Sequence, residues 1–281
     1  MISLFLAILA GVVVKVVYKY IEDKDIDGDS VMVVNYVVTT LIALKLCIGE
    51  KIILNMHGSS IILCSIVGIF QAIMLVYNYL AVRKGILECG ASMTTVFSSI
   101  GNMLTVLVSV FLFGELPHFL QWIGILLAFG SFFLENIDFE SGIQWSFKGV
   151  LLWIALMTCL MGINYKVIQI SAEAEYNNMF LFISFFLSLL LCGVVFRKKR
   201  CKYGCREILF GIIMGIPNIA CSYFLMDALK TVPATIAYPV NSAGSIVVTV
   251  VICAVLFRER WRKNEICAIF TTILGVVLIN L

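Results

Sequence analysis

Ten long apolar stretches, separated by short polar turns, constrain this chain more than any other feature of its sequence. The hydrocarbon core of a bilayer is about 30 Å thick, and a helix needs roughly 20 apolar residues to cross it. Barrel strands are excluded because they run only about 9–11 residues with alternating polarity. We therefore predict an all-α integral membrane protein with ten transmembrane helices. The expected spans are 2–20, 31–48, 59–81, 89–113, 119–136, 148–168, 178–196, 207–229, 234–257 and 264–281.

Composition excludes a soluble alternative. The 281 residues are 62% apolar and 13% charged, whereas a soluble domain averages about 45–50% apolar and about 25% charged residues. A water-facing shell would need far more charged side chains than the chain provides. The first apolar stretch has no basic segment before it and no small-residue cleavage site, so we expect it to be a retained span rather than a signal peptide.

The two halves of the chain are related in sequence. A shift of 144 residues lays the segment 98–136 over 242–280 and superimposes two Phe-x-Glu pairs, and a shift of 151 superimposes two Gly-x-x-x-Lys pairs. Because five spans per half is an odd number, the second half must enter the membrane inverted. We predict two five-helix repeats, 1–140 and 141–281, with a substrate site near the midplane between them. The matched pairs are Phe113 and Glu115 with Phe257 and Glu259, and Gly11 and Lys15 with Gly162 and Lys166.

Several short motifs resemble a known family. The sequence is similar to the EamA-type transporters of the drug/metabolite transporter superfamily, and its end also resembles the small multidrug resistance proteins. The resemblance implies ten helices in two inverted repeats and secondary transport of small metabolites or drugs. Where the small multidrug resistance proteins carry a glutamate in the first span, this chain has Lys15, which argues against proton-coupled cation export by that route. The motifs are Leu112–Pro117 (LFGELP), Ala228–Ala234 (ALKTVPA), Tyr238–Asn241 (YPVN), Leu256–Arg260 (LFRER) and Leu274–Leu281 (LGVVLINL).

The orientation in the membrane stays open between two indications. Lysine and arginine near span ends prefer the cytoplasm, and the clusters at residues 83–84, 197–206 and 258–263 lie in loops on one side of a ten-span chain. This charge bias places both termini outside. The family resemblance implies cytoplasmic termini instead.

Charged side chains within spans are the first candidates for a substrate path, because such groups are costly in hydrocarbon and usually face a polar interior. Lys15 and Lys166 are either a cationic pair beside a cavity, suited to an anionic or zwitterionic substrate, or side chains that extend to the interface. Asp227 is either a carboxylate coupled to transport or the partner of Lys230 one turn away. Glu88, between the third and fourth spans, is its nearest counterpart in the first half.

Amide side chains within spans form the second group of candidates. Each can bind a substrate or hold two helices together, and together they favour a polar path. Tyr238 and Asn241 flank Pro239, which removes a backbone donor and bends its helix, and Pro217 precedes Asn218 in a second break. The amides are Asn35, Gln71, Asn78, Asn102, Asn164, Asn218 and Asn241.

No catalytic or nucleotide-binding motif is present. The sequence has no Walker loop, no His-Glu-x-x-His and no Gly-x-Ser-x-Gly, and two histidines offer no zinc constellation. We expect a non-enzyme without a cofactor or metal: a secondary transporter that moves a small metabolite or drug across the cell membrane by alternating access. The alternative is a lipid-linked-sugar flippase or an accessory membrane subunit. The expected partners are a small-molecule substrate and the lipid bilayer, with a homodimer as a possible assembly and no nucleic acid. Substrate, coupling ion and direction stay open.

Overall fold

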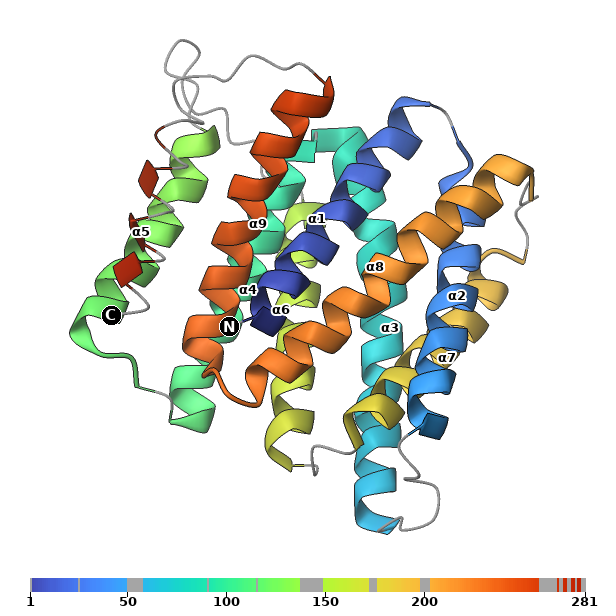
Figure 1. Ribbon diagram of the computed structural model, residues 1–281, viewed down its shortest axis with the longest axis horizontal. Helices are drawn as coiled ribbons and strands as arrows, with labels where there is room; N and C mark the ends of the chain where they lie inside the picture. The colour runs from blue at the N-terminus through green and yellow to red at the C-terminus, as the bar shows by residue number, and fades with distance from the viewer. Residues whose placement is uncertain are drawn as a thin grey trace. The chain divides into compact units, whose positions relative to one another are not determined.

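The computed structural model shows an all-helical chain within the residues that it describes (Figure 1). These are residues 2–24, 26–49, 58–89, 91–114, 116–136, 149–171, 176–197 and 203–257, together with single positions between 267 and 278. The helices are α1 (Ile2–Asp23), α2 (Gly28–Gly49), α3 (Gly58–Cys89), α4 (Ala91–Phe113), α5 (Phe119–Asn136), α6 (Gly149–Ser171), α7 (Asn177–Val195), α8 (Cys205–Leu229) and α9 (Ala234–Phe257).

The described helices coincide closely with the first nine expected spans. Five of them, α2, α3, α6, α7 and α8, are long and apolar enough to cross a membrane, and α1 and α4 contain shorter apolar helices. The helix α3 runs beyond the expected span to Cys89, whereas its membrane-spanning part ends at Gly85. Glu88 therefore lies after that span, in the last turn of α3, where it is paired with Lys84 at 3.7 Å. Most of the expected tenth span, 264–281, lies outside the described residues.

The start of α2 is fixed by a local capping interaction that the hydropathy pattern does not show. Asp27 precedes the helix, and its carboxylate accepts hydrogen bonds from the Ser30 hydroxyl at 2.6 Å and the Asp29 backbone N–H at 3.3 Å. Such a carboxylate satisfies N–H groups that have no partner inside the helix. The helix therefore begins three residues before the apolar stretch.

The chain divides into two compact units, each assembled from separate parts of the sequence. Unit 1 contains residues 1–76 and 164–231, and unit 2 contains residues 77–163 and 232–281. Each unit thus takes helices from both predicted repeats. The division of the sequence at residue 140 remains a prediction about homology between the halves.

In unit 1, α8 packs along both α1 and α2, and α2 also packs against α7 (Figure 1). Close approach is achieved at glycines: a Cβ at Gly211 or Gly215 of α8 would overlap Val34 or Val38 of α2. Without a hydrophobic driving force between helices in lipid, such small residues allow the backbone contact that holds transmembrane helices together.

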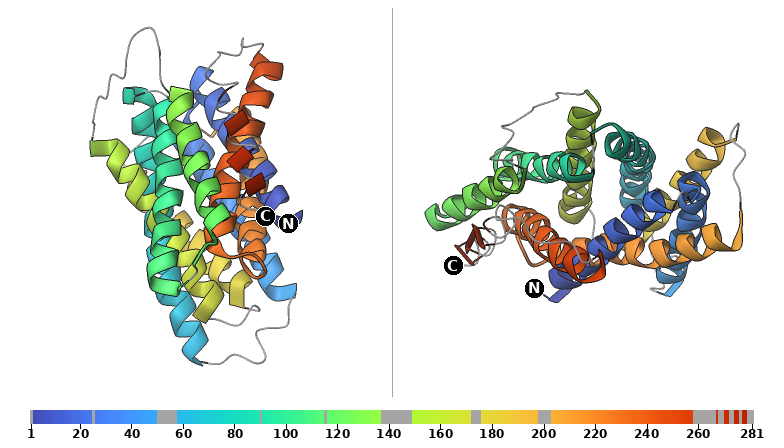
Figure 2. Two further views of the ribbon diagram at one scale, coloured as in Figure 1. Left: turned by 90° about the vertical axis from the view of Figure 1, so that its left-hand side faces the viewer. Right: turned by 90° about the horizontal axis from the view of Figure 1, so that it is seen from above.

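In unit 2, α4 packs against α5 and α9, and α5 also contacts α9 (Figure 2). The end of α3 and the start of α6 share an apolar core with α4, in which Ala81, Phe97 and Ile154 are buried. At Gly101 of α4 a Cβ would collide with the backbone carbonyl of Ala155 in α6, so these two helices touch through their backbones.

Candidate functional site

Buried polar side chains from four helices of unit 1 are connected by hydrogen bonds. Between α6 and α3, Asn164 Nδ2 donates to Gln71 Oε1 at 3.0 Å, and the Gln71 side chain is fully buried. Gln71 also lies close to the Tyr165 hydroxyl. The amides at 71 and 164, which sequence reasoning selected separately, therefore form a single contact.

A second group of contacts joins α6 to α8. The Tyr165 hydroxyl donates to Ser222 Oγ at 3.1 Å, and the Ser222 hydroxyl donates to the Asn218 carbonyl at 3.4 Å. Pro217 lies within α8 and has no N–H, so the carbonyl of Ile213 lacks its usual helical partner. The polar groups of α8 therefore cluster just after the point where its backbone ladder is interrupted.

The contacts continue from α8 to α2. Asn218 Nδ2 donates to Asn35 Oδ1 at 3.2 Å, and Asn35 Nδ2 lies 3.5 Å from Met32 Sδ. Asn35 is fully buried. We name the connected set the polar chain of unit 1; its members are Asn35, Gln71, Asn164, Tyr165, Asn218 and Ser222.

The polar chain consists of neutral amide and hydroxyl groups. Such groups both donate and accept hydrogen bonds, so they can exchange partners with a polar solute without a change of charge. Several buried side-chain atoms of unit 1 have no hydrogen-bond partner, among them Gln71 Nε2 and Ser184 Oγ. Unpaired polar atoms are costly in a protein interior, and each of these atoms retains the capacity to bond a water or a solute group.

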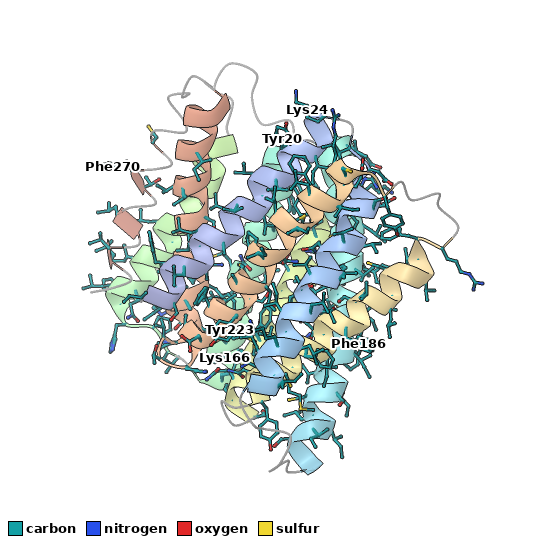
Figure 3. The ribbon with its side chains drawn as sticks, turned by 45° about the vertical axis from the view of Figure 1, so that its right-hand side comes forward. Tyr20, Lys24, Lys166, Phe186, Tyr223 and Phe270 are labelled. Carbon is teal, nitrogen blue, oxygen red and sulfur yellow. The ribbon has the colours of Figure 1, made fainter. Side chains whose placement is uncertain are left out.

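Two lysines lie in the same unit. Lys15 of α1 is half-buried and its charge acts on Cys221 of α8, next to Ser222; a Cβ at Gly11, one turn earlier, would lie 3.3 Å from the Cys221 sulfur. Lys166 is 6% exposed (Figure 3). Protein therefore covers Lys166, and its side chain is not exposed at the surface of the helix bundle.

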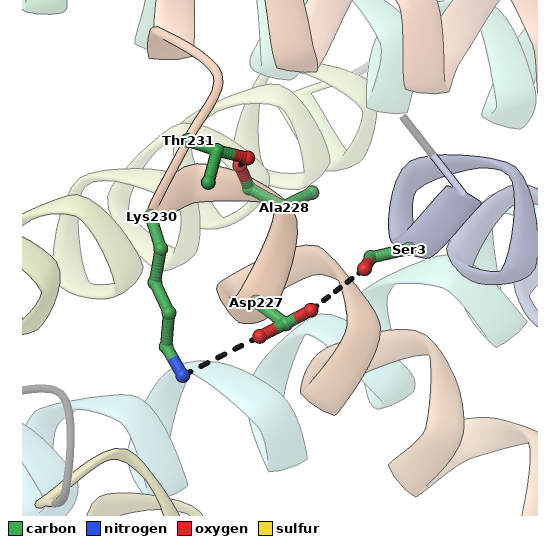
Figure 4. Close-up of polar contacts among 5 residues, drawn as sticks. All are labelled: Ser3, Asp227, Ala228, Lys230 and Thr231. Carbon is green, nitrogen blue, oxygen red and sulfur yellow. Dashed lines mark hydrogen bonds and ion pairs between the residues drawn. The ribbon is translucent and has the colours of Figure 1, made fainter.

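Asp227 lies at the C-terminal end of α8 and makes two contacts there (Figure 4). The Ser3 hydroxyl of α1 donates to its Oδ2 at 2.6 Å, and Lys230 Nζ lies 3.4 Å from its Oδ1. The side chains of Asp227 and Lys230 are 39% and 35% exposed. The expected pairing one turn away is present, and the second contact links the end of α8 to the start of α1.

The remaining candidates lie in unit 2. Asn102 Nδ2 of α4 donates to Ser242 Oγ of α9 at 2.7 Å, and the Tyr238 hydroxyl donates to the Gly162 carbonyl of α6 at 2.7 Å. Asn78 and Asn241 each have a buried Oδ1 without a hydrogen-bond partner. Tyr238 and Asn102 therefore each bond to a neighbouring helix within this unit.

Sequence reasoning missed Tyr165 and Ser222, the two hydroxyl members of the polar chain. Tyrosine and serine are common in transmembrane helices, so neither stands out by residue type. Their positions in the sequence could have identified them. Tyr165 lies between the candidates Asn164 and Lys166, and Ser222 lies one helical turn after the candidate Asn218. Among the described residues, no group of three histidine, cysteine or acidic side chains could hold a metal ion.

These features define a class of protein: a multi-pass α-helical membrane protein with polar groups inside its helix bundle. Residues 148–281 match the model of the EamA-like transporter family. This match over the second half of the chain confirms the resemblance to the EamA-type drug/metabolite transporters. The match indicates a membrane transporter of small solutes.

Two further comparisons cover nearly the whole chain. An uncharacterized protein of Haemophilus influenzae is 24% identical over 271 residues, which are 93% of this chain and 91% of that protein. A crystal structure of another protein superposes with a TM-score of 0.77 at 14% identity, covering 99% of this chain and 94% of the other. The second likeness shows that the two chains share a fold.

Proposed function

We propose that the protein is a secondary transporter that moves a small polar metabolite across the cell membrane by alternating access between two inverted repeats. The observation that carries the proposal is the polar chain of unit 1, because hydrogen-bonded amides from α2, α3, α6 and α8 meet inside a membrane protein. Polar side chains are costly inside a membrane protein, and they are retained there where they line a solute path or join helices.

Reciprocal glycine contacts support the inverted repeat. A Cβ at Gly68 of α3 would lie 2.7 Å from Ile183 Cγ2 of α7, and a Cβ at Gly215 of α8 would lie 2.8 Å from Val38 Cβ of α2. A shift of 147 residues carries Gly68 onto Gly215 and places Ile183 between positions 35 and 38. The α3–α7 contact and the α8–α2 contact therefore correspond to each other under this shift, as the proposed inverted repeats require.

The same shift relates members of the polar chain. It carries Gln71 onto Asn218, which follow the two glycines by three residues, and it carries the Tyr-Lys pair at 18–19 onto Tyr165-Lys166. In this register the counterpart of Lys166 is Lys19, whereas the shift of 151 had paired it with Lys15. The repeats therefore place an amide at equivalent positions of α3 and α8, as expected for a site shared by two inverted halves.

The substrate class follows from the groups that the polar chain and its neighbours offer. Amides and hydroxyls bind the polar groups of a solute, and Lys15 and Lys166 supply positive charge within unit 1. Lysine ammonium groups form charge-assisted hydrogen bonds with carboxylates and phosphates. We therefore favour a small solute that carries a carboxylate or another anionic group.

Transport assays in proteoliposomes test the proposal. We expect Gln71→Leu and Asn218→Leu to reduce uptake of a responsive solute, from a panel of amino acids, amines and organic acids, at least tenfold, because each removes an amide from the polar chain. The matched control is Ser171→Ala at the exposed end of α6, which should leave uptake unchanged. Uptake unaffected by both leucine substitutions, in proteins of normal stability, would contradict the proposal.

The lysines and Asp227 are tested separately. Lys15→Ala and Lys166→Ala should weaken the preference for anionic over neutral solutes, whereas Asp227→Asn should leave pH-driven accumulation intact because Asp227 binds Ser3 and Lys230 at the helix end. Loss of accumulation in Asp227→Asn would instead assign Asp227 a coupling role.

A second candidate function, movement of a lipid-linked sugar, is favoured by one feature of unit 2. An open, mainly apolar groove of about 340 Å³ lies between the end of α3 and the start of α6. A flippase needs such a lateral surface for a lipid chain. Scrambling of a fluorescent lipid-linked sugar in liposomes distinguishes the two functions, since a transporter of soluble solutes would leave it at the protein-free rate. The groove is lined by Tyr77, Leu80, Ala81, Lys84, Gly149, Val150 and Trp153.

A further inference from the structure

A small polar pocket lies in unit 1 where α7 begins and α8 ends, and none of its lining residues is a member of the polar chain. Asn177 and Asn178 line it from the first turn of α7, and Asp227 and Lys230 line it from the end of α8. It has room for about one water-sized group. We name it the α7 pocket.

Both asparagines are buried with unused hydrogen-bonding atoms. Asn177 is 6% exposed and Asn178 is 4% exposed. Asn177 Oδ1, Asn177 Nδ2 and Asn178 Oδ1 have no hydrogen-bond partner. Native proteins rarely leave three such atoms together, because each unpaired buried polar atom is costly. The three atoms therefore point to a ligand rather than to packing.

The acceptors of the pocket match a primary ammonium group. Asn177 Oδ1, Asn178 Oδ1 and the Asp227 carboxylate are three acceptors, and an ammonium of the lysine type has three N–H donors. In this structure the Lys230 ammonium lies 3.4 Å from Asp227 Oδ1, so a cation of this kind already occupies one side of the pocket. An ammonium is also close to water in size, which fits the available room.

The donors of the pocket match an anionic group beside that ammonium. The N-cap residue Tyr176 provides no side-chain cap for α7, so the N–H groups of its first turn have no partner within the helix and carry partial positive charge. Asn177 Nδ2 and the Lys230 ammonium add further donors. An amine alone would be repelled by this helix end, whereas a zwitterion satisfies both sides of the pocket.

We propose that the α7 pocket binds a zwitterion that carries a primary ammonium next to an anionic oxygen group. Two sources share this chemistry: the headgroup of phosphatidylethanolamine, which is available where transmembrane helices end, and a soluble molecule such as phosphoethanolamine. The ammonium binds among Asn177, Asn178 and Asp227, and the anionic group binds toward Lys230 and the start of α7. The inference does not rest on transport.

Thermal unfolding of the purified, delipidated full-length protein tests the proposal without any substitution. Short-chain phosphatidylethanolamine is compared with its mono-, di- and trimethylated forms and with phosphatidylglycerol, which lacks the amine. We expect apparent affinity to fall at each methylation and to drop at least tenfold for the trimethylated form, because it has lost all three N–H donors. Equal protection by the unmethylated and trimethylated lipids would overturn the proposal.

A second arm identifies the source. Phosphoethanolamine that competes with the short-chain lipid at similar concentration indicates a soluble zwitterion, and phosphoethanolamine that fails to compete indicates the lipid headgroup; both results uphold the ammonium site. Phosphoethanolamine should also outcompete ethanolamine, which lacks the anionic group. Equal competition by these two compounds would contradict the zwitterion assignment.

Variants then locate the site. Asn178→Ala and Asp227→Asn should each abolish the preference for phosphatidylethanolamine over its trimethylated form, because each removes an acceptor or its charge. The matched control is Thr231→Ala at the same end of α8, since Thr231 bonds to the Ala228 carbonyl (Figure 4) and does not line the pocket. A preference that survives both pocket variants places the headgroup elsewhere and refutes the assignment, whether or not transport is retained.

Discussion

Gly215→Ala tests both the packing of unit 1 and the proposed repeat. The added Cβ would lie 2.8 Å from Val38 Cβ and 3.1 Å from the Asn35 carbonyl oxygen. A valine in a helix is largely restricted to one side-chain rotamer, so it cannot turn away, and the backbone carbonyl cannot move alone. The two helices must therefore separate.

The expected magnitude comes from two opposing terms. Overpacking a tight contact costs about 1–3 kcal/mol, and replacing a helical glycine with alanine returns at most about 1 kcal/mol. With about 1 kcal/mol returned, the net loss of unfolding free energy is about 0–2 kcal/mol. Gly68→Ala should have the same sign and a similar size, because its Cβ would lie 2.7 Å from Ile183 Cγ2, another β-branched side chain.

Chemical or thermal unfolding in mild detergent measures these changes. The matched control is Gly193→Ala in α7, where no atom lies within 4 Å of the added Cβ; it should stabilise the protein by about 0.5–1 kcal/mol. Truncation of the opposing side chain, as in Gly215→Ala with Val38→Ala, should recover part of the loss. If Gly215→Ala proved as stable as Gly193→Ala, the close α2–α8 contact and the argument built on it would be refuted.

The remaining predictions concern unit 2. Tyr238→Phe should reduce the unfolding free energy by about 0.5–1.5 kcal/mol, because the hydroxyl donates to the Gly162 carbonyl at 2.7 Å; no change in unfolding would argue against this bond. A double-mutant cycle of Asn102→Ala and Ser242→Ala should show a coupling energy of about 0.6 kcal/mol, and no more than about 1.7, as found for hydrogen bonds between transmembrane helices, since the two side chains bond at 2.7 Å. Additive effects would show that this contact is not formed in the membrane.

The helices were predictable because their lengths are set by the bilayer rather than by packing. Apolar runs of suitable length fix a span almost independently of what surrounds it, and α5 and α9 begin and end where the hydropathy pattern placed them. The ends that differ depend on local chemistry. The helix α2 begins before its apolar stretch because the Asp27 carboxylate accepts a hydrogen bond from Ser30 in the first turn. The helix α3 continues beyond its apolar stretch through a last turn that includes Glu88.

The sequence predicted which residue types form the candidate site, but it did not predict the hydrogen bonds that connect them. Buried amides such as Asn35 and Gln71 stood out because polar groups are rare and costly in spans. Which amides meet depends on helix contacts between distant parts of the chain, and those depend on glycines whose role cannot be read from one sequence. The proposed register of the repeat is an example, since the contacts of Gly68 and Gly215 pointed to a shift of 147 residues only once the partner helices were known.

The way each unit is assembled has a consequence for how the protein is made. Unit 1 needs residues 1–76 together with residues 164–231, so α1 and α2 enter the bilayer long before the ribosome has synthesised α7 and α8. Until then, the fully buried side chain of Asn35 lacks its partner Asn218 and must be hydrated or held by the insertion machinery. Early termination of synthesis would leave these helices in the membrane with polar side chains exposed to lipid, a form that quality-control proteases can recognise.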